Sequence, residues 1–216
     1  MTPPAILTAK NLGFDSPSQQ LFTDQSFALQ AGVTLLRGDQ GTGKTLLLRL
    51  VAGELAATRG TLQIHNALLT DAPEAYRRQV FWIDPRSAAF DALDPITPVA
   101  YLHSVSRLYP QFEQTVASSL TDDFALSEHI AKPFYMLSTG TKRKVLLTAA
   151  FACGAAVTLL DEPFAALDKA SSSCVMSRLD NAARQDRRAW LVAHHGPVCS
   201  EPLAGVIDLD AWQKDQ

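Results

Sequence analysis

The chain has 216 residues, of which 47% are hydrophobic and 19% charged, with 12 prolines and 11 glycines spread along it. This composition excludes an intrinsically disordered chain, a collagen-like repeat and a long coiled coil, and it predicts one domain with a substantial core. The 19 basic and 22 acidic residues give a net charge of -3, so we expect no nucleic-acid partner.

The cysteines and the N-terminal sequence indicate the compartment. Cys153, Cys174 and Cys199 form neither a metal-binding pattern nor a disulfide framework, which predicts reduced thiols in a cytoplasmic setting. The first residues carry neither a basic region nor an apolar stretch ending at small residues, so we expect no secretory signal.

Strand patterns open the chain. Residues 5–14 and 25–30 alternate between apolar and polar side chains around the turn-rich segment DSPSQQ, which predicts an antiparallel edge sheet. An apolar strand at 33–37 is followed by a glycine-rich turn and a leucine-rich helix that ends near Gly53. Further strands are predicted at 61–65 and 80–83.

The pattern changes between residues 87 and 136. Helical periodicity appears at 99–109 and 115–124, with prolines between the segments and no long β-branched run. We therefore predict an inserted helical subdomain over 87–136. The core then comprises residues 1–86 and 137–216.

Strands and helices alternate again after residue 137. Helices are predicted at 140–152 and 169–184, and strands at 157–160, 190–193 and 205–209. The apolar segment 145–160 would reach about 24 Å as one helix, less than the ~30 Å hydrocarbon layer, and it contains Gly154. We therefore predict a helix, a turn and a buried strand there rather than a membrane span. The alternation predicts an α/β fold with a mostly parallel sheet.

A glycine-rich loop lies between the predicted strand at 33–37 and the helix that follows it. Residues 38–45 read GDQGTGKT and fit the pattern GxxxxGK[ST], with roughly a 1% probability of a chance match in a chain of this length. Inward-facing amides, the helix N-terminus and Lys44 favour a polyphosphate, and the Thr45 hydroxyl is suited to Mg2+. The predicted nucleotide-binding residues are Gly38, Asp39, Gln40, Gly41, Thr42, Gly43, Lys44 and Thr45.

Two carboxylates follow the strand at 157–160, at the end where parallel sheets bind ligands. Asp161 is predicted to face Mg2+, directly or through water, and Glu162 to orient and deprotonate an attacking water. A solvated turn is the alternative for an isolated acidic pair, but the phosphate loop favours the catalytic interpretation. His194 and His195 end another strand, and we choose His194 as the donor to a γ-phosphate. His65, His103 and His129 are expected to be surface or packing residues.

With these motifs in place, the sequence resembles the ATP-binding subunits of ABC transporters over essentially its whole length. Residues 137–141 (LSTGT) are similar to that family's signature motif, 161–163 (DEP) to its second nucleotide motif, 166–168 (ALD) to its dimer-contacting loop, and His194 to its switch histidine. The resemblance implies that Ser138, Gly140 and Asp168 act on the ATP held by a second subunit. Ser138 and the Gly140 amide, at a predicted helix start, also form an anion site by themselves.

The chain departs from that family at three places. Thr139 and Thr141 replace the usual glycine and glutamine, which resembles a variant of some exporter-type subunits, so we expect function to be retained. The segment Asp84-Pro85-Arg86 replaces a usual glutamine and predicts an altered contact to Mg2+ and water. The aromatic residue that stacks on adenine in the family falls near Ser16. Phe14 is either a substitute for it or a core strand residue, so weak binding of the base is expected.

Several other conspicuous residues receive structural interpretations. Phe81, Trp82 and Trp190 lie in or beside predicted strands and are expected to pack in the core. Cys153 and Cys174 are expected to act as small apolar side chains on helices. The basic run at 142–144 is expected to form a solvated face.

The sequence therefore predicts a P-loop NTPase core with an antiparallel β subdomain and an inserted helical subdomain. Its predicted function is ATP hydrolysis that drives a membrane transporter through closure of a homodimer or heterodimer. The catalytic residues are Lys44, Glu162 and His194, and the metal ligands are Thr45 and Asp161. The chain would lie on the inner face of the cell membrane, bound to an integral membrane subunit, with export slightly favoured over import. Two alternatives are an ATP-binding module with little hydrolysis and a soluble P-loop kinase.

Overall fold

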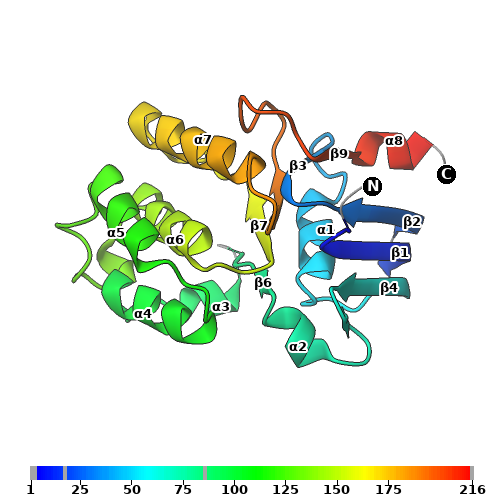
Figure 1. Ribbon diagram of the computed structural model, residues 1–216, viewed down its shortest axis with the longest axis horizontal. Helices are drawn as coiled ribbons and strands as arrows, with labels where there is room; N and C mark the ends of the chain where they lie inside the picture. The colour runs from blue at the N-terminus through cyan, green and yellow to red at the C-terminus, as the bar shows by residue number, and fades with distance from the viewer. Residues whose placement is uncertain (1–3, 17–18, 85–86, 215–216) are drawn as a thin grey trace.

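The computed structural model describes residues 4–16, 19–84 and 87–214 (Figure 1). Within these ranges the strands form two sheets. One is antiparallel with the order β2-β1-β4-β5, and the other is parallel with the order β6-β7-β8-β3-β9. The predicted α/β class, with an antiparallel part beside a parallel sheet, is confirmed.

The antiparallel sheet comprises β1 (Leu7–Ser16), β2 (Gln19–Leu29), β4 (Arg59–Ile64) and β5 (Ala67–Leu68). Alternation places Leu7 and Ala9 in the core, while Thr8 and Lys10 are more exposed. The strands extend further into the expected turn than their pattern indicated, because pairing continues to Ser16 and Gln19. The centre of that turn, residues 17 and 18, lies outside the described residues.

The parallel sheet comprises β3 (Gly32–Arg37), β6 (Val80–Phe81), β7 (Val157–Asp161), β8 (Ala189–Ala193) and β9 (Gly205–Asp208). Strand β8 is buried throughout, and β7 is buried up to its last residue, as continuous apolar runs in a covered parallel sheet should be. Ala193 of β8 pairs with Leu36 of β3 and with Asp161 of β7. The carboxyl ends of three strands therefore meet at one edge.

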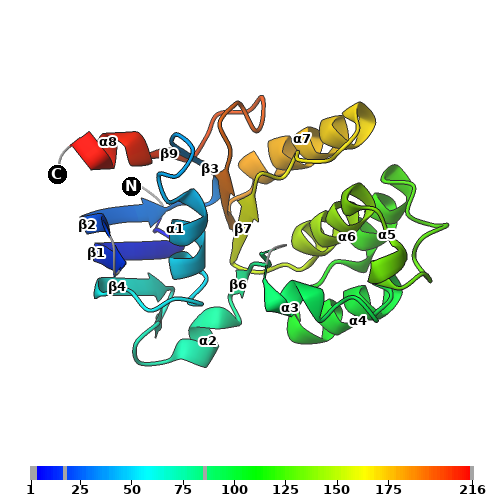
Figure 2. The ribbon, with the colours of Figure 1, turned by 180° about the vertical axis from the view of Figure 1, so that it is seen from behind.

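Helix α1 (Lys44–Val51) packs between the two sheets (Figures 1 and 2). Its buried leucines belong to the same apolar cluster as residues of β1, β4, β7 and β8. Two short helices, α2 (Pro73–Arg77) and α8 (Leu209–Lys214), were not predicted, because five or six residues carry too little periodicity to be recognised.

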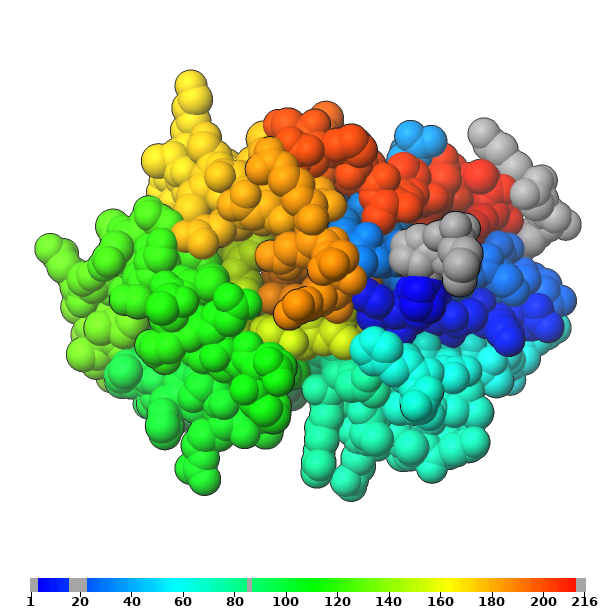
Figure 3. All heavy atoms as spheres, in the orientation of Figure 1, coloured from blue at the N-terminus to red at the C-terminus, as the bar shows by residue number. Residues whose placement is uncertain are grey.

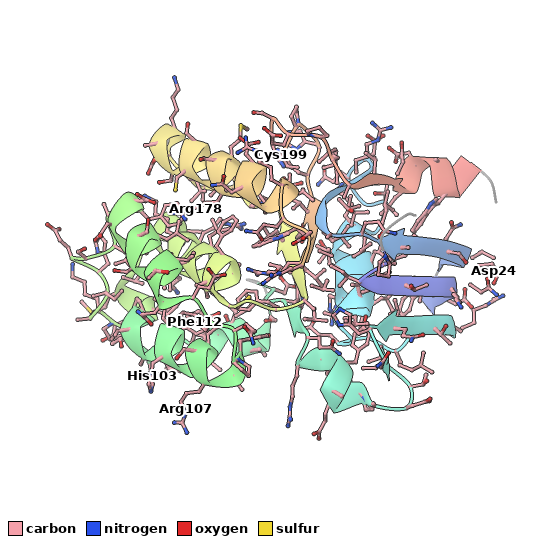
Figure 4. The ribbon with its side chains drawn as sticks, in the orientation of Figure 1. Asp24, His103, Arg107, Phe112, Arg178 and Cys199 are labelled. Atoms are coloured by element: carbon pink, nitrogen blue, oxygen red, sulfur yellow. The ribbon has the colours of Figure 1, made fainter. Side chains whose placement is uncertain are left out.

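The segment 87–136 contains α3 (Ala88–Asp91), α4 (Pro98–Leu108), α5 (Gln114–Asp123) and the 3-10 helix η1 (Phe134–Met136). It forms one end of the molecule, and the antiparallel sheet forms the other (Figure 3). These helices share an apolar cluster with α6 (Thr139–Ala152) and α7 (Lys169–Ala183). Arg178 of α7 lies between α7 and α5 (Figure 4), where it donates to Asp123 Oδ2 at 2.8 Å.

The apolar segment 145–160 folds as predicted. Helix α6 ends at Ala152, Gly154 adopts a left-handed conformation with φ +71°, and β7 begins at Val157. Helix α6 is buried over its last two turns, which explains why residues 145–152 are almost entirely apolar. In the described parts of the chain, no helix combines the length and apolar character needed to cross a bilayer.

A buried cation closes the carboxyl end of α6. Arg188 is only 9% exposed, and its guanidinium donates to the carbonyl oxygens of Ala150 and Phe151 at 3.2 Å and of Ala155 at 2.9 Å. It also lies 4.6 Å from the centre of the Trp190 ring. Ala150 and Phe151 lie in the last turn of α6, where carbonyls lack intrahelical partners, and Arg188 donates to them in a buried site.

Replacing Arg188 with leucine should lower the free energy of unfolding by roughly 2–4 kcal/mol, because three buried carbonyls lose the hydrogen bond from its guanidinium. Urea unfolding followed by far-UV circular dichroism measures this change without depending on Trp190 fluorescence. Arg187→Leu is the matched control, since the Arg187 side chain is 92% exposed. Equal unfolding midpoints for the two variants would contradict the role assigned to Arg188.

Candidate functional site

An open cleft of about 820 Å³ lies beside the ends of β3 and β7. Its lining comes from the phosphate loop and the start of α1, from the end of β7 and the residues after β7 and β8, and from α6. Its lining comprises Gly38, Asp39, Gln40, Gly41, Gly43, Lys44, Thr45, Leu46, Arg143, Asp161, Glu162 and His195.

The loop 38–45 turns from β3 into α1 through glycines in the left-handed region. Gly41 has φ +86° and Gly43 has φ +99°, a conformation that L side chains rarely adopt. Lys44 begins α1, and its Nζ donates to the carbonyl oxygens of Gly38 at 2.5 Å and Asp39 at 2.9 Å. Lys44 and the N-terminus of α1 line the cleft, and the Lys44 ammonium is held by carbonyls of its own loop.

Helix α8 fixes the base of this loop. The Asp39 N–H donates to both carboxylate oxygens of Asp210, at 3.0 and 3.2 Å. The Asp39 carbonyl in turn accepts from Thr42 Oγ1 at 2.9 Å and from Lys44. Sequence reasoning missed Asp210 because it lies far from the loop along the chain, and an acidic residue in a short C-terminal helix gives no distinguishing signal.

The predicted metal ligands lie side by side. Thr45 Oγ1 at the start of α1 donates to Asp161 Oδ2 at the end of β7, over 2.6 Å. A hydroxyl and a carboxylate are hard oxygen donors of the kind Mg2+ prefers. The residues therefore fit the ion that the sequence predicts.

Glu162 and His194, the predicted base and γ-phosphate donor, are also in contact. Glu162 Oε2 lies 2.6 Å from His194 Nδ1 and 3.8 Å from His195 Nδ1. The His194 side chain is 14% exposed and packs against Phe164, whereas that of His195 is 80% exposed. His194 is therefore the histidine in close contact with Glu162, whereas His195 is the one that lines the cleft, and the choice of His194 as donor to a γ-phosphate stays a prediction.

The backbone at Glu162 is held in a strained conformation. Its φ of 47° lies in the left-handed region, which costs a non-glycine residue about 1 kcal/mol or more. The Glu162 N–H donates to the Ala193 carbonyl at 2.9 Å, and its own carbonyl accepts from Arg143 at 2.7 Å. Both peptide groups of the predicted base are therefore fixed by neighbouring elements.

The expectation that residues 142–144 form a solvated face is wrong. Lys142 pairs with Asp94 at 2.9 Å, Arg143 donates to the carbonyls of Asp161 and Glu162, and Lys144 pairs with Asp168 at 2.9 Å. Successive helix positions point about 100° apart, so the three side chains meet three different segments. The sequence pattern cannot show this because all three partners are distant in the chain.

The signature-like loop caps α6. Ser138 Oγ accepts from the Thr141 N–H at 3.1 Å. A Cβ at Gly140 would lie 2.6 Å from the Ala166 carbonyl oxygen, so only glycine allows this close approach. The signature-like segment 138–141, which includes the start of α6, therefore lies against the loop before α7 at Ala166.

Asp168 has partners within its own chain. It caps α7 by accepting from the Ser171 N–H at 2.8 Å, and it pairs with Lys144. The hydrogen bond from Lys144 and those from Ser171 hold the pKa of the Asp168 carboxyl well below its usual range. Among the described residues, Ser138, Gly140 and Asp168 are not part of the cleft lining.

Two of the three departures from the family pattern, the adenine-stacking position and the segment 84–86, are described in part by the structure. Phe14 is half-buried and packs against the apolar cluster under the antiparallel sheet, as a core strand residue does. Asp84 is buried, and Pro85 and Arg86 lie outside the described residues.

Phe81 and Trp190 are buried as predicted, and Trp82 is partly buried. All three cysteines are free thiols.

Comparisons with known proteins agree with these motifs. The family model described as "ABC transporter" matches residues 22–165. The cytochrome c biogenesis ATP-binding export protein CcmA of Pseudomonas syringae is 30% identical over 209 residues, covering 96% of each chain. The ABC transporter ATP-binding protein YtrB of Bacillus subtilis is 26% identical and covers 91% of this chain and 70% of the relative.

Solved structures share the fold. A structure titled as the ATP-binding subunit of an ABC transporter has a TM-score of 0.77 at 24% identity, covering 88% of this chain and 79% of that one. A putative ABC transporter ATP-binding protein from Pyrococcus furiosus has a TM-score of 0.74 at 18% identity, covering 95% and 98%.

Arg143→Gln should lower kcat for ATP hydrolysis about tenfold or more while KM for ATP changes little, because the backbone of Glu162 loses its donor. Steady-state ATPase assays across ATP concentrations separate the two parameters. Lys142→Gln is the control, because Lys142 directly precedes Arg143 in α6 but pairs with Asp94 instead of the Glu162 carbonyl. A parallel loss of kcat in both variants would point to general damage to α6 and contradict a specific role for Arg143.

The Asp168 carboxylate should make stability depend on pH in a defined direction. Its folded-state pKa lies below the ordinary value, so its charged form stabilises the fold above about pH 4, and this contribution is lost as the pH falls further. Urea midpoints of the parent and Asp168→Asn should therefore differ at neutral pH and converge in acid. Asp186→Asn, at a 96% exposed side chain, should show little difference at any pH. A constant gap at all pH values would refute the assignment.

Proposed function

The chain belongs to the ATP-binding subunits of ABC transporters and is a transport-coupled ATPase, and from this premise we propose which residues carry the reaction and how two subunits combine. The observation that carries the proposal is the contact of 2.6 Å between Glu162 and His194 beside the phosphate loop. Glu162 lines the same cleft as the phosphate loop, which supports its assignment as the base, and the contact supports His194 as the residue that positions it.

In the proposed mechanism, the amides of residues 38–45 and Lys44 bind the β- and γ-phosphates. Thr45 and Asp161 hold Mg2+, which when bound neutralises charge on the phosphate oxygens. Glu162 orients the attacking water and takes its proton, and His194 keeps the carboxylate in place and donates to the γ-phosphate. Arg143 keeps the Glu162 peptide in its left-handed conformation.

Two chains form the complete site in this proposal. Ser138, Gly140 and Asp168 bind the ATP held by the phosphate loop of the second subunit, either an identical chain or a close relative. The proposal is supported by their position outside the chain's own cleft and by the direct packing of loop 138–141 on loop 166–168. Hydrolysis then separates the subunits again.

ABC ATP-binding subunits pair with membrane transporter subunits, and we assign the transmission of motion to the helical subdomain at 87–136. The core at 1–86 and 137–216 would bind nucleotide, and the chain would lie on the inner face of the membrane. The relative's name, an export protein, supports export over import. The transported substrate is expected to contact the membrane subunit.

The two alternatives make different predictions. An ATP-binding module with little hydrolysis would retain ATP tightly and show negligible steady-state turnover with its membrane partner. A soluble kinase would transfer phosphate to an added metabolite, but that function leaves the loop 138–141 without a role, and family membership disfavours it.

Glu162→Gln should retain ATP binding and lose hydrolysis, because the amide keeps the size of the side chain but cannot take a proton. With ATP and Mg2+, the variant should shift to a dimer on a sizing column, whereas the parent remains mostly monomeric during turnover. Lys44→Ala is the control and should neither bind ATP tightly nor dimerise. Turnover by Glu162→Gln at the parent rate would rule out Glu162 as the base.

A further inference from the structure

His195 is a second imidazole beside the predicted base, and the proposed hydrolysis gives it no role. Its Nδ1 lies 3.8 Å from Glu162 Oε2, and its ring centre lies 4.3 Å from that of His194. The Glu162 carboxylate is thus flanked by two imidazoles. His195 lines the cleft, and its side chain is largely exposed.

These three side chains form a group of metal-binding donors. One oxygen of Glu162 and one ring nitrogen from each histidine lie within 4.8 Å of one another. Zn2+ binds such atoms at about 2.0–2.2 Å, which sets neighbouring ligands roughly 3.3 Å apart in a tetrahedral site. The His195 ring can move to meet that spacing without disturbing the core, since its side chain is 80% exposed.

Backbone hydrogen bonds fix the segments that carry two of these donors, Glu162 and His194. Glu162 follows β7 and the histidines follow β8, its parallel neighbour. The Glu162 N–H donates to the Ala193 carbonyl at 2.9 Å, and the His194 N–H donates to the Leu36 carbonyl at 3.1 Å. Two of the three donors therefore stand on segments tied to the central sheet, so little conformational entropy is lost when an ion binds.

The donor set selects a class of ion. Two histidines and one glutamate are a known ligand set for zinc that leaves a fourth position open, and imidazole nitrogen suits Zn2+ and Co2+ better than Mg2+. The group is therefore chemically distinct from the oxygen pair of Thr45 and Asp161.

We propose that Glu162, His194 and His195 bind a divalent transition-metal ion such as Zn2+, and that the bound ion suppresses ATP hydrolysis. The ion takes the carboxylate oxygen that would accept the proton of water, and it also takes the His194 nitrogen that positions this oxygen. Metal binding requires only the geometry described here, whereas the inhibitory effect rests on the proposed function of Glu162.

Binding is tested with the purified chain and metal ion alone. Co2+ titration followed by visible absorption, and Zn2+ titration by calorimetry, should give one ion per chain. His195→Ala and His195→Asn should each weaken binding at least about tenfold, since a ligand is lost. His103→Ala is the matched control, because His103 is an exposed histidine that points away from the molecule on α4 (Figure 4). No binding, or binding unaffected by both His195 variants, would overturn the site.

Inhibition is tested separately with excess Mg2+ and ATP. The Zn2+ concentration that inhibits the parent should equally inhibit His103→Ala, whereas His195→Ala should need a concentration at least about tenfold higher. A chelator should reverse the inhibition. Binding that follows the variants without inhibition would overturn the regulatory role and leave the metal site in place. Absence of ATPase activity in every sample without Zn2+ would count against the proposed function, while the Co2+ titration, which needs no turnover, still decides the metal site.

Discussion

Parallel pairing of β3, β7 and β8 brings three strand ends that are far apart in the sequence to one edge of the sheet. Leu36 and Asp161 both pair with Ala193, so the phosphate loop, the carboxylates and the histidines begin at the same level. A slip of one residue in any of these strands would turn its side chains to the opposite face. Because the strands are buried, apolar packing rather than the polar site residues holds this register.

Helix α6 connects the site to the helical end of the molecule. Its apolar turns share a cluster with α4 and α5, and its first two turns contact Asp94, the Glu162 carbonyl and Asp168. Helix α6 therefore packs on the helical segment and, through Arg143, bonds the peptide of the predicted base. The close packing of Gly140 on Ala166 extends this connection to the loop before α7.

The loop after β7 is the strained part of the structure. Glu162 and Ala166 both adopt left-handed conformations that cost non-glycine residues about 1 kcal/mol or more each. Such conformations persist where neighbours over-determine them, and here Ala193, Arg143 and the close contact with Gly140 do so. The same loop carries Glu162, the predicted base, and leads to Asp168 of the proposed subunit contact. The strain therefore lies where the direction of a side chain has to be precise.

The sequence by itself determined the features that depend on consecutive residues. The phosphate loop, the acidic pair, the long helices and the buried strands were recognised because glycine positions, charge and apolar runs are local signals. Tertiary structure alone decided which side chains meet. Asp210 supports Asp39 from the other end of the chain, the basic run 142–144 finds three separate partners, and His194 rather than His195 contacts Glu162 most closely. These contacts follow from strand register and core packing, which bring distant segments together and leave no mark on the neighbouring sequence.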